Sequence, residues 1–514
     1  MTTTGPRPRR PLRLLVGILV AVVVLCCCGS AGVTGWLLLR PGIDTAGKVD
    51  FRNPLAVPPL APSRIDDEGR RVFDLRAQAG QRDFGRGTAT RTWGFEGDYL
   101  GPTLRATRGE RVVVDVVNGL PEPTSVHWHG MRLPAVMDGG PHQEVRPGAT
   151  WSPTWTVDQP AATLWYHPHP HGKTEEHVYR GLAGMFIIDD ERESALPLPR
   201  DYGVDDFPVI VQDKNFDRDG QLRVTRNMFS DIGTLGDTLL VNGTVAPYLD
   251  VTTERVRLRL LNGSTARTYD FGLADDRPFA LIGTDGGLLP APHTTRRITL
   301  SPGERAEIVV EMRAGERVAV RSFPPALGNV FSDRFAGGED TFDVLELRAA
   351  GTLAAAPDLP DQLVPVERID PASAVTTRSL DFAGRGINGK SMDMGRIDAA
   401  VVRGSVEIWE VTKLDGTPHN LHVHDVQFQV LTIGGEPPPP HLAGWKDTIL
   451  LPDDDTVRII MRFGDHADPN VPYMYHCHLL YHEDQGMMGQ FVVVEPGQSA
   501  GTPPRGGAGH SHGQ

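Results

Sequence analysis

Histidines in closely spaced pairs dominate the chemistry that this sequence could perform. Successive side chains of a β-strand point to opposite faces, so the two histidines of a His-x-His pattern emerge on one face and can hold a metal ion together. Four such pairs in one chain indicate metal binding rather than chance. They occur in the segments His127-Trp128-His129, His167-Pro168-His169, His419-Asn420-Leu421-His422-Val423-His424 and His476-Cys477-His478, and His482 and Met487 follow the last segment.

The Cys477 segment divides its residues between two metal sites. His476 and His478 share one face of a strand while Cys477 points to the other, so a site must flank each face. A thiolate with two imidazoles and a weak thioether is the ligand set of a blue-copper electron-transfer centre. The loop after Cys477 supplies suitable groups, because His482 and Met487 can fold back onto the face of the thiol.

A second strand repeats this division. His419 lies an odd number of residues before His422 and His424, which sends it toward the Cys477 side and the other two toward the opposite side. The predicted blue-copper ligands are His419, Cys477, His482 and Met487, with Met488 left open as an alternative to Met487. Eight histidines then remain for three further copper ions, namely His127, His129, His167, His169, His422, His424, His476 and His478.

These motifs resemble those of the three-domain multicopper oxidases, in particular bacterial copper-efflux oxidases, spore-coat laccases and bilirubin oxidases, over about residues 50 to 496. The resemblance implies four copper ions and a reaction that couples one-electron oxidation of a donor to four-electron reduction of dioxygen to water. It also implies roles for the ligands: His419, Cys477, His482 and Met487 for the type 1 copper, His127 and His422 for type 2, and His129, His167, His169, His424, His476 and His478 for the type 3 pair.

Two carboxylates are candidates for supplying protons to oxygen reduction. By the resemblance, Asp138 and Glu483 occupy positions at which multicopper oxidases have acidic residues that supply protons. Two structural interpretations stay open: Asp138 could only shape the Gly-rich turn that follows it, and Glu483 could orient its neighbour His482.

The electron donor is less well specified. Phenols, aromatic amines, bilirubin-like compounds and cuprous or ferrous ions all remain open, and Asp415, four residues before His419, could help a donor dock. Copper-efflux relatives carry a Met- and His-rich insert, whereas this chain offers only Met392 and Met394 in that stretch. That feature does not support a cuprous oxidase in copper tolerance, which stays open as an alternative. A copper nitrite reductase is disfavoured by the pair around Cys477. A non-catalytic envelope or cell-division relative would be expected to have lost ligands, and none is missing.

The composition restricts the classes of molecule that the protein could bind. The chain has 514 residues and a formal net charge of -14, with a sequence pI near 5.7. Such acidity, without a Lys/Arg cluster in the body, gives no basis for nucleic-acid binding. Three of the four cysteines lie at positions 26–28, which leaves Cys477 alone and the body without a disulfide. We expect a monomer.

The N-terminus predicts contact with a membrane. A basic segment of residues 1–13, with four arginines, precedes an uncharged segment of residues 14–39. A run of that length can cross a bilayer core about 30 Å thick, and the arginines predict that it enters from the cytoplasm. We therefore expect an anchored body on the extracytoplasmic face; export after signal cleavage is the alternative, and Arg9-Arg10 is a weak sign of the twin-arginine route.

The segments that carry and surround the histidines have the sequence pattern of β-strands. Short Val- and Ile-rich runs alternate with polar residues and end at Gly, Pro or Asp, and Arg255 to Leu260 has one apolar and one charged face. A turn-and-strand pattern recurs near residues 101–118, 242–262 and 388–411. At about 100–200 residues per domain, we expect an all-β chain of three Greek-key β-sandwich domains, cupredoxin-like by the resemblance. The predicted domains are residues 50–195, 205–350 and 370–497, and residues 498–514 form a disordered tail with His510 and His512.

Overall fold

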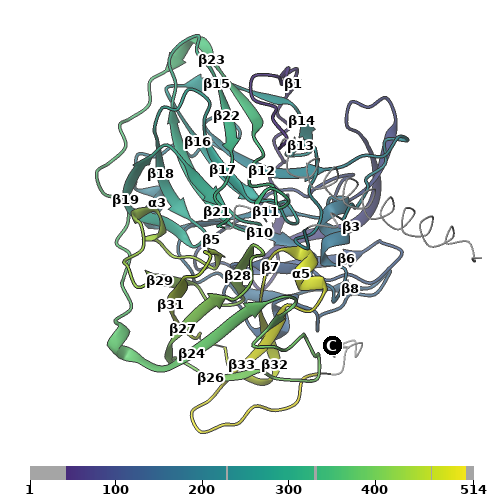
Figure 1. Cartoon of the computed structure of the whole chain (residues 1–514), viewed down its shortest axis with the longest axis vertical. Coiled ribbons are helices and arrows are strands. Elements are labelled where there is room, and N and C mark those ends of the chain that lie inside the picture. The colour runs from purple at the N-terminus through teal and green to yellow at the C-terminus, as the bar shows by residue number, and fades with distance from the viewer. Residues whose placement is uncertain (1–41, 227–229, 329–332, 465, 505–514) are drawn as a thin grey trace, which may run out of the picture. The chain divides into compact units, whose positions relative to one another are not determined.

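The computed structural model describes residues 42–226, 230–328, 333–464 and 466–504. The predicted basic segment 1–13, the apolar segment 14–39 and the two tail histidines lie outside these residues. Within them, no helix combines the length and the apolar character needed to cross a membrane. The residues from Asp44 onward form one compact unit, and the all-β prediction is confirmed because strands dominate its secondary structure (Figure 1).

The first stretch of the chain forms two sheets. In the sheet order β2-β3-β6-β8, with β4 on β3 and β9 on β6, the strands are β2 (Ser63–Ile65), β3 (Arg71–Asp83), β6 (Arg111–Asn118), β8 (Thr150–Trp151), β4 (Ala89–Phe95) and β9 (Thr154–Thr156). The second sheet runs β5 (Leu104–Thr107), β11 (Gly184–Asp189), β10 (Ala162–His167) and β7 (His127–His129). The short helices of this stretch are η1 (Ala135–Met137), α2 (Thr174–Arg180) and α3 (Glu191–Ser194).

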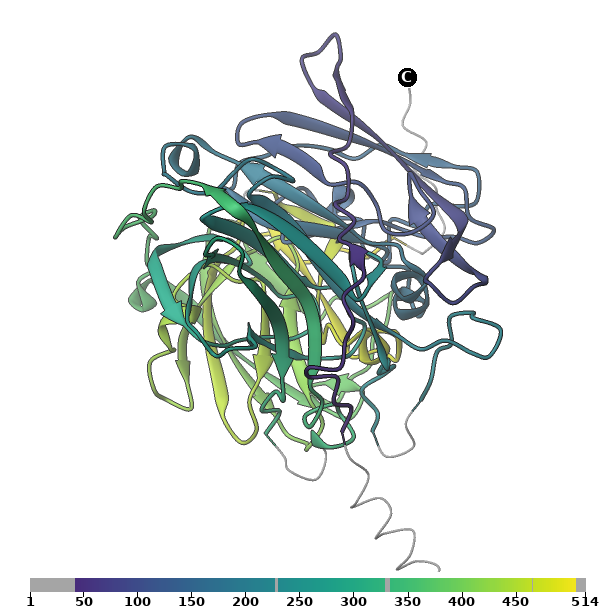
Figure 2. The ribbon, with the colours of Figure 1, turned by 90° about the horizontal axis from the view of Figure 1, so that it is seen from above.

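The second stretch also builds two sheets. One runs β14 (Thr244–Val245), β13 (Thr238–Val241), β12 (Asp206–Lys214), β16 (Arg255–Asn262), β21 (Arg305–Glu311), β18 (Phe279–Thr284) and β19 (Gly287–Thr295). The other runs β1 (Asn53–Pro54), β15 (Pro247–Thr253), β23 (Phe342–Ala354), β22 (Arg317–Phe323), β17 (Tyr269–Leu273) and β20 (Ile298–Leu300). The strand β1, although inside the predicted first domain, pairs with β15, and the purple segment that leads into it runs beside these strands in Figure 2.

The third stretch repeats the arrangement. One sheet runs β25 (Gly386–Ile387), β24 (Ala374–Ala383), β27 (Val406–Lys413), β31 (Thr456–Arg462) and β29 (Phe428–Ile433). The other runs β26 (Ala399–Val402), β33 (Met488–Val494), β32 (Asp468–His476), β28 (His419–Val423) and β30 (Thr448–Leu451). The short helices are η2 (Pro371–Ser373), η3 (Pro440–Leu442) and α5 (Leu480–Asp484). The limits predicted for the three domains stay a prediction.

Strand pairing places the histidine pairs beside one another. His127 on β7 is the register partner of His167 on β10, and His422 on β28 is the partner of His476 on β32. Register partners in an antiparallel pair point to the same face. Each half of the histidine set is therefore assembled by one pair of adjacent strands.

The strand β16 forms as its alternating pattern predicts, but its charged face is not exposed to solvent. Arg257 and Arg259 are each 1% exposed. Arg259 pairs with Asp206 at 2.7 Å and with Glu307 at 3.1 Å, and Arg257 also pairs with Glu307. Buried charges need such partners to offset their desolvation. The charged face of β16 therefore packs within the molecule, toward β10.

Candidate metal centres

One cluster surrounds the thiol of Cys477. Its Sγ lies 3.6 Å from Nδ1 of His419 and 3.5 Å from Nδ1 of His482, and all three side chains are buried. His419 begins β28, Cys477 follows β32, and His482 lies on α5. The structure thus brings together three of the four residues that strand alternation and the following loop assigned to a blue-copper site.

The far nitrogen of each imidazole is held by an acceptor. Nε2 of His419 lies 3.1 Å from Oδ1 of Asp415, and Nε2 of His482 lies 2.9 Å from the carbonyl of Asp231. Both Nε2 atoms therefore donate, which leaves both Nδ1 lone pairs facing the thiol. Burial raises the pKa of the Cys477 thiol to about 12 and lowers the pKa of His482 to about 3. A copper ion would displace the thiol proton on binding, and a soft thiolate with two imidazoles fits copper.

Met487 is the better-placed thioether. It is fully buried in the same apolar cluster as Cys477, and the two residues are joined by a hydrogen bond from the Cys477 amide to the Met487 carbonyl of 3.1 Å. Met488 is instead the register partner of His476, so its side chain lies on the His476 face of the sheet. The geometry favours Met487 over Met488.

The eight remaining histidines converge in a second buried cluster. The Nε2 atoms of His127 and His422 are 3.4 Å apart. The Nε2 atom of His476 lies 3.3 Å from that of His169 and 3.2 Å from that of His424. These contacts join residues 52 to 307 positions apart in the chain.

Three of these rings have an acceptor at Nδ1, on the side away from the facing ring. Nδ1 of His127 donates to the Asp138 carbonyl at 3.0 Å, and Nδ1 of His422 donates to the Asp447 carbonyl at 2.9 Å. Nδ1 of His424 lies 2.8 Å from Oδ2 of Asp138. Because each neutral ring carries one N–H, the Nε2 atoms present lone pairs to one another. Imidazoles that share a metal ion bind it at roughly 2 Å each, so this arrangement fits cations between the rings.

Within the eight-histidine cluster, one group contains His129, His167 and His478. Their ring centroids lie 4.9 to 5.7 Å apart. Nδ1 of His167 donates to the Pro168 carbonyl at 2.8 Å, which leaves Nε2 without a partner. His129 is reversed, since its Nε2 lies 3.0 Å from Oδ1 of Asp447 and its Nδ1 has no partner. Both ring nitrogens of His478 lack a hydrogen-bond partner. His129 and His167 lie close enough to share a metal ion with His127, and the ring of His478 packs against both of them.

Burial favours the neutral form of seven of these rings. Removal from water, helped by the neighbouring histidines, lowers the pKa values of seven of the eight rings, and that of His476 falls to about 3. A neutral imidazole offers the lone pair that a metal needs. The seven are His129, His167, His169, His422, His424, His476 and His478.

Both predicted acidic residues lie against the eight-histidine cluster. Asp138 is 1% exposed, and its carboxylate contacts His424, so it does more than shape a turn. The carboxylate of Glu483 lies 3.4 Å from Nδ1 of His169 and 3.3 Å from Nδ1 of His476. These contacts place it beside His169 and His476, and the acceptor for His482 is the Asp231 carbonyl. Burial raises the pKa of Glu483 well above its ordinary value, and Asp484 adds to this rise.

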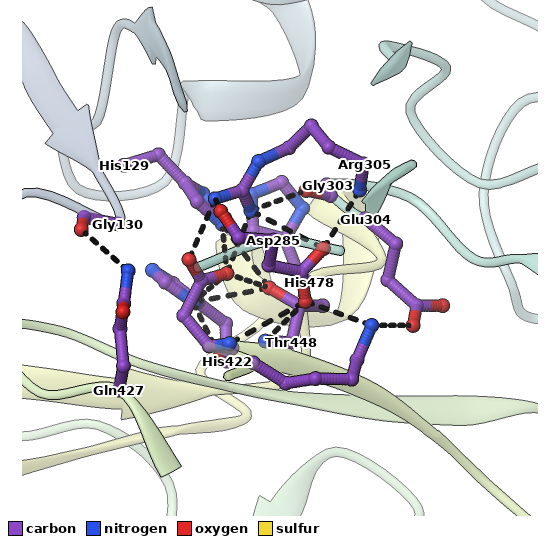
Figure 3. A network of polar contacts seen from close by, with 12 residues as sticks. His129, Gly130, Asp285, Gly303, Glu304, Arg305, His422, Gln427, Thr448 and His478 are labelled. Atoms are coloured by element: carbon purple, nitrogen blue, oxygen red, sulfur yellow. Dashed lines mark hydrogen bonds and ion pairs between the residues drawn. The ribbon is translucent and has the colours of Figure 1, made fainter. Parts of the chain in front are cut away.

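Several residues around the cluster were not foreseen from the sequence. Asp447, just before β30, contacts both His129 and His422, and Thr448 lies 3.1 Å from each of the same two rings. Arg305, from the second stretch, binds Asp447 (Figure 3). The available signal was weak: a polar run at residues 446–448 that opens an apolar strand.

The isolated histidines stay apart from these groups. His177 contacts Thr124 at 3.0 Å and Glu122 at 2.9 Å, and His142 contacts Gln490. Within the described part of the chain, the residue groups close enough to share a metal ion contain none of the six histidines at positions 142, 171, 177, 293, 441 and 466.

Known proteins resemble this chain over most of its length. Family profiles described as multicopper oxidase match residues 76–193 and 356–497. Cell division protein FtsP of Photorhabdus laumondii is 38% identical over 453 residues, which cover 86% of this chain and 93% of that protein. Multicopper oxidase mco of Staphylococcus haemolyticus is 36% identical over 449 residues, with the same coverage. The structure of CueO, a laccase-like multicopper oxidase from Ochrobactrum sp., matches with a TM-score of 0.78 and 36% identity, covering 86% of this chain and all of that one.

Proposed function

The chain belongs to the multicopper oxidase family, and on that premise we propose that it is an active oxidase with oxygen as the electron acceptor. The observation that carries the proposal is the convergence of eight buried imidazoles, five of which bring Nε2 atoms within 3.2 to 3.4 Å of one another, one residue away from a buried thiol. Bound copper would supply one-electron transfer at the thiol and four-electron reduction of dioxygen at the histidines.

The ligand roles in this proposal follow the sequence prediction. His419, Cys477, His482 and Met487 would hold the type 1 ion, and the eight remaining histidines would hold the type 2 ion and the type 3 pair, four ions in all. Cys477 joins the two clusters covalently, because its neighbours in the chain are His476 and His478. An electron that enters at the thiol therefore reaches the second cluster through bonds.

Protons for oxygen reduction are assigned to Asp138 and Glu483. Each carboxylate is buried and lies within 3.4 Å of a ring nitrogen of the eight-histidine cluster. A buried acid whose pKa is raised, as that of Glu483 is, retains a proton that it can deliver.

We propose that the electron donor binds near Asp415. Its carboxylate contacts the outer nitrogen of His419 and is part of a cavity of about 390 Å³ that Asp453 and Asp454 also line. One cation, Lys413, pairs with Asp453. The acidic excess favours cationic donors such as cuprous and ferrous ions, and it supports the alternative of a cuprous oxidase.

A second candidate is a role like that named for the FtsP relatives, in cell division. It is favoured by their identity and coverage, whereas the complete ligand set of this chain favours the oxidase. The predicted extracytoplasmic location, through residues 14–39, suits both candidates.

The deciding experiment measures copper content, blue absorption and oxygen uptake of the copper-loaded protein with cuprous ion, ferrous ion, a phenol and bilirubin. We expect four copper ions per chain and uptake with at least one donor. Full copper loading without uptake for any donor would overturn the oxidase and favour the second candidate.

A further inference from the structure

A single arginine of the second stretch reaches the eight-histidine cluster without supplying a ligand. Arg305 begins β21 and is fully buried. All five of its N–H groups donate: Nε to the Thr163 carbonyl at 2.9 Å, Nη1 to the Gly303 carbonyl at 3.1 Å and to Asp447 at 2.7 Å, and Nη2 to the Asp285 carbonyl at 2.9 Å and to Asp447 at 2.7 Å. The guanidinium has no freedom left to turn.

These partners come from all three stretches of the chain. Thr163 lies on β10, the strand that ends at His167, and Asp447 belongs to the third stretch. Asp285 and Gly303, of the second stretch, lie beside Arg305 in Figure 3. Arg305 therefore fixes, with one planar group, the relative position of the two segments that carry the histidines.

Asp447 passes this constraint to two rings. Its carboxylate accepts from Nε2 of His129 at 3.0 Å, and its backbone carbonyl accepts from Nδ1 of His422 at 2.9 Å. Asp447 thus holds the two rings in opposite tautomers. His129 carries its hydrogen on Nε2 and leaves Nδ1 free, whereas His422 carries its hydrogen on Nδ1 and leaves Nε2 free. The two rings stack with centroids 3.6 Å apart, so neither can turn without moving the other.

The surroundings hold Asp447 in this orientation. Lys446 pairs with Asp285 and Glu304, both at 2.8 Å. Gly130, directly after His129, has φ +85°, and an added Cβ would lie 2.5 Å from Oδ2 of Asp447. Glycine is needed there because the carboxylate approaches the backbone this closely.

We propose that Arg305 is a positioning residue for oxygen reduction: by clamping Asp447 in two-point contact, it sets the tautomers with which His129 and His422 face the metal. The proposal rests on the proposed function, since it assigns a role within the same site. Without the bidentate partner, the buried Asp447 carboxylate would be free to turn, and His129 would lose the acceptor that keeps Nδ1 free.

The chain offers a matched control for the test. Arg259 is also buried, lies on the neighbouring strand β16 and contacts Thr163 at 2.8 Å. Its carboxylate partners, Asp206 and Glu307, make no hydrogen bond to a histidine among those described, whereas Asp447, the partner of Arg305, does. Arg305→Lys and Arg259→Lys both keep the charge and lose the planar fork. A structural cost alone would affect both variants.

The experiment loads wild type and both variants with copper and records copper retained against a chelator, blue absorption, the paramagnetic resonance signal of the type 2 ion, and oxygen uptake. In Arg305→Lys we expect unchanged blue absorption, an altered type 2 signal, and a roughly 10- to 100-fold loss of uptake or of affinity at the histidine cluster. Arg259→Lys should keep the wild-type signal and uptake. Asp447→Asn, as a second variant, should alter the same signal.

Three outcomes decide the matter separately. An unaltered type 2 signal in Arg305→Lys, or an equal change in Arg259→Lys, would overturn the positioning role while the wild type still consumed oxygen. If Arg305→Lys fails to fold, an unaltered signal in Asp447→Asn would overturn it instead. Failure of the wild type to consume oxygen would overturn the proposed function, and the retained copper and resonance signals would still report on Arg305.

Discussion

The thiol cluster and the eight-histidine cluster are built over very different distances in the chain. The thiol cluster takes its side chains from residues 419–487 of the third stretch. The eight-histidine cluster joins rings as far as 307 residues apart and takes its clamp from the second stretch. The thiol cluster is thus encoded locally, whereas the eight-histidine cluster depends on side chains from distant stretches of the chain.

The two clusters also differ in their surroundings. Cys477 lies within an apolar core cluster with Leu421, Leu479 and Met487. The histidines of the second cluster contact three buried carboxylates, those of Asp138, Asp447 and Glu483. An apolar shell suits a group that exchanges only electrons, while acidic groups suit a reaction that consumes protons.

The largest expected effect would separate the two clusters. Cys477→Ser should abolish blue absorption and lower donor-driven oxygen uptake by roughly three orders of magnitude, because the soft thiolate is the ligand that defines the blue-copper site. Copper at the eight histidines should remain, measured as metal content. Uptake that survives the substitution would show that electrons reach the histidines by another path.

Acid should destabilise the copper-free protein mainly through the eight-histidine cluster. Seven of its rings have pKa values lowered from 6.5 by burial, against His482 alone in the thiol cluster. Because the unfolded state then binds more protons, stability is present above pH 6.5 and is lost as pH falls below it, by about 1.4 kcal/mol per pH unit for each proton taken up.

Urea unfolding of the copper-free protein at pH 7.5 and pH 5.5 tests this expectation. The raised pKa values of Glu483 and Asp484 offset part of the loss. His482→Asn should change the slope by about one proton only. Equal stability at both pH values would contradict the account.

Proton delivery should depend on Glu483 and not on Asp484, the next residue in the chain. Glu483→Gln should slow oxygen reduction by about 100-fold, within the range for loss of a general acid, and leave blue absorption intact. Asp484→Asn is the control, since that carboxylate accepts from the amides of Thr174 and Glu175 at 2.8 and 3.0 Å and holds α2. Unchanged turnover across pH in Glu483→Gln would dismiss its role.

The loop after Cys477 offers a test with two neighbouring methionines. Met487→Leu should raise the reduction potential of the blue site and shift its spectrum, because the weak axial thioether tunes that potential. Met488→Leu should leave both unchanged, since Met488 lies on the His476 face. A shift in the second variant and none in the first would exchange their roles.

The smallest effect concerns the donor. Asp415→Asn should raise KM for cuprous or ferrous ions by about 10-fold and change KM for a neutral phenol little, because the lost charge acts only on cations. Asp454→Asn, on the same cavity but not in contact with His419, should have a smaller effect. Equal KM changes for both donors would remove the electrostatic explanation.

The sequence carried much of the site because strand alternation is a local property. The positions of His419 and Cys477 followed from the parity of residues within short segments, as did the opposite face of His422 and His424, and that of His482 followed from the short loop after Cys477. The burial of Arg257 and Arg259 could not be predicted this way, since the pattern of β16 shows only that two faces differ. Nor could the pairing of β1 with β15, which joins strands about 195 residues apart.

The motifs and the two-residue period of the strands were enough to predict the family, the all-β class and the histidines that share a face. Which nitrogen of a ring is free could be seen only in the folded chain, since that depends on acceptors such as Asp447 and Asp231 that lie far away in the sequence. It alone also brought Arg305 to the cluster, because a buried guanidinium is placed by the packing of whole sheets.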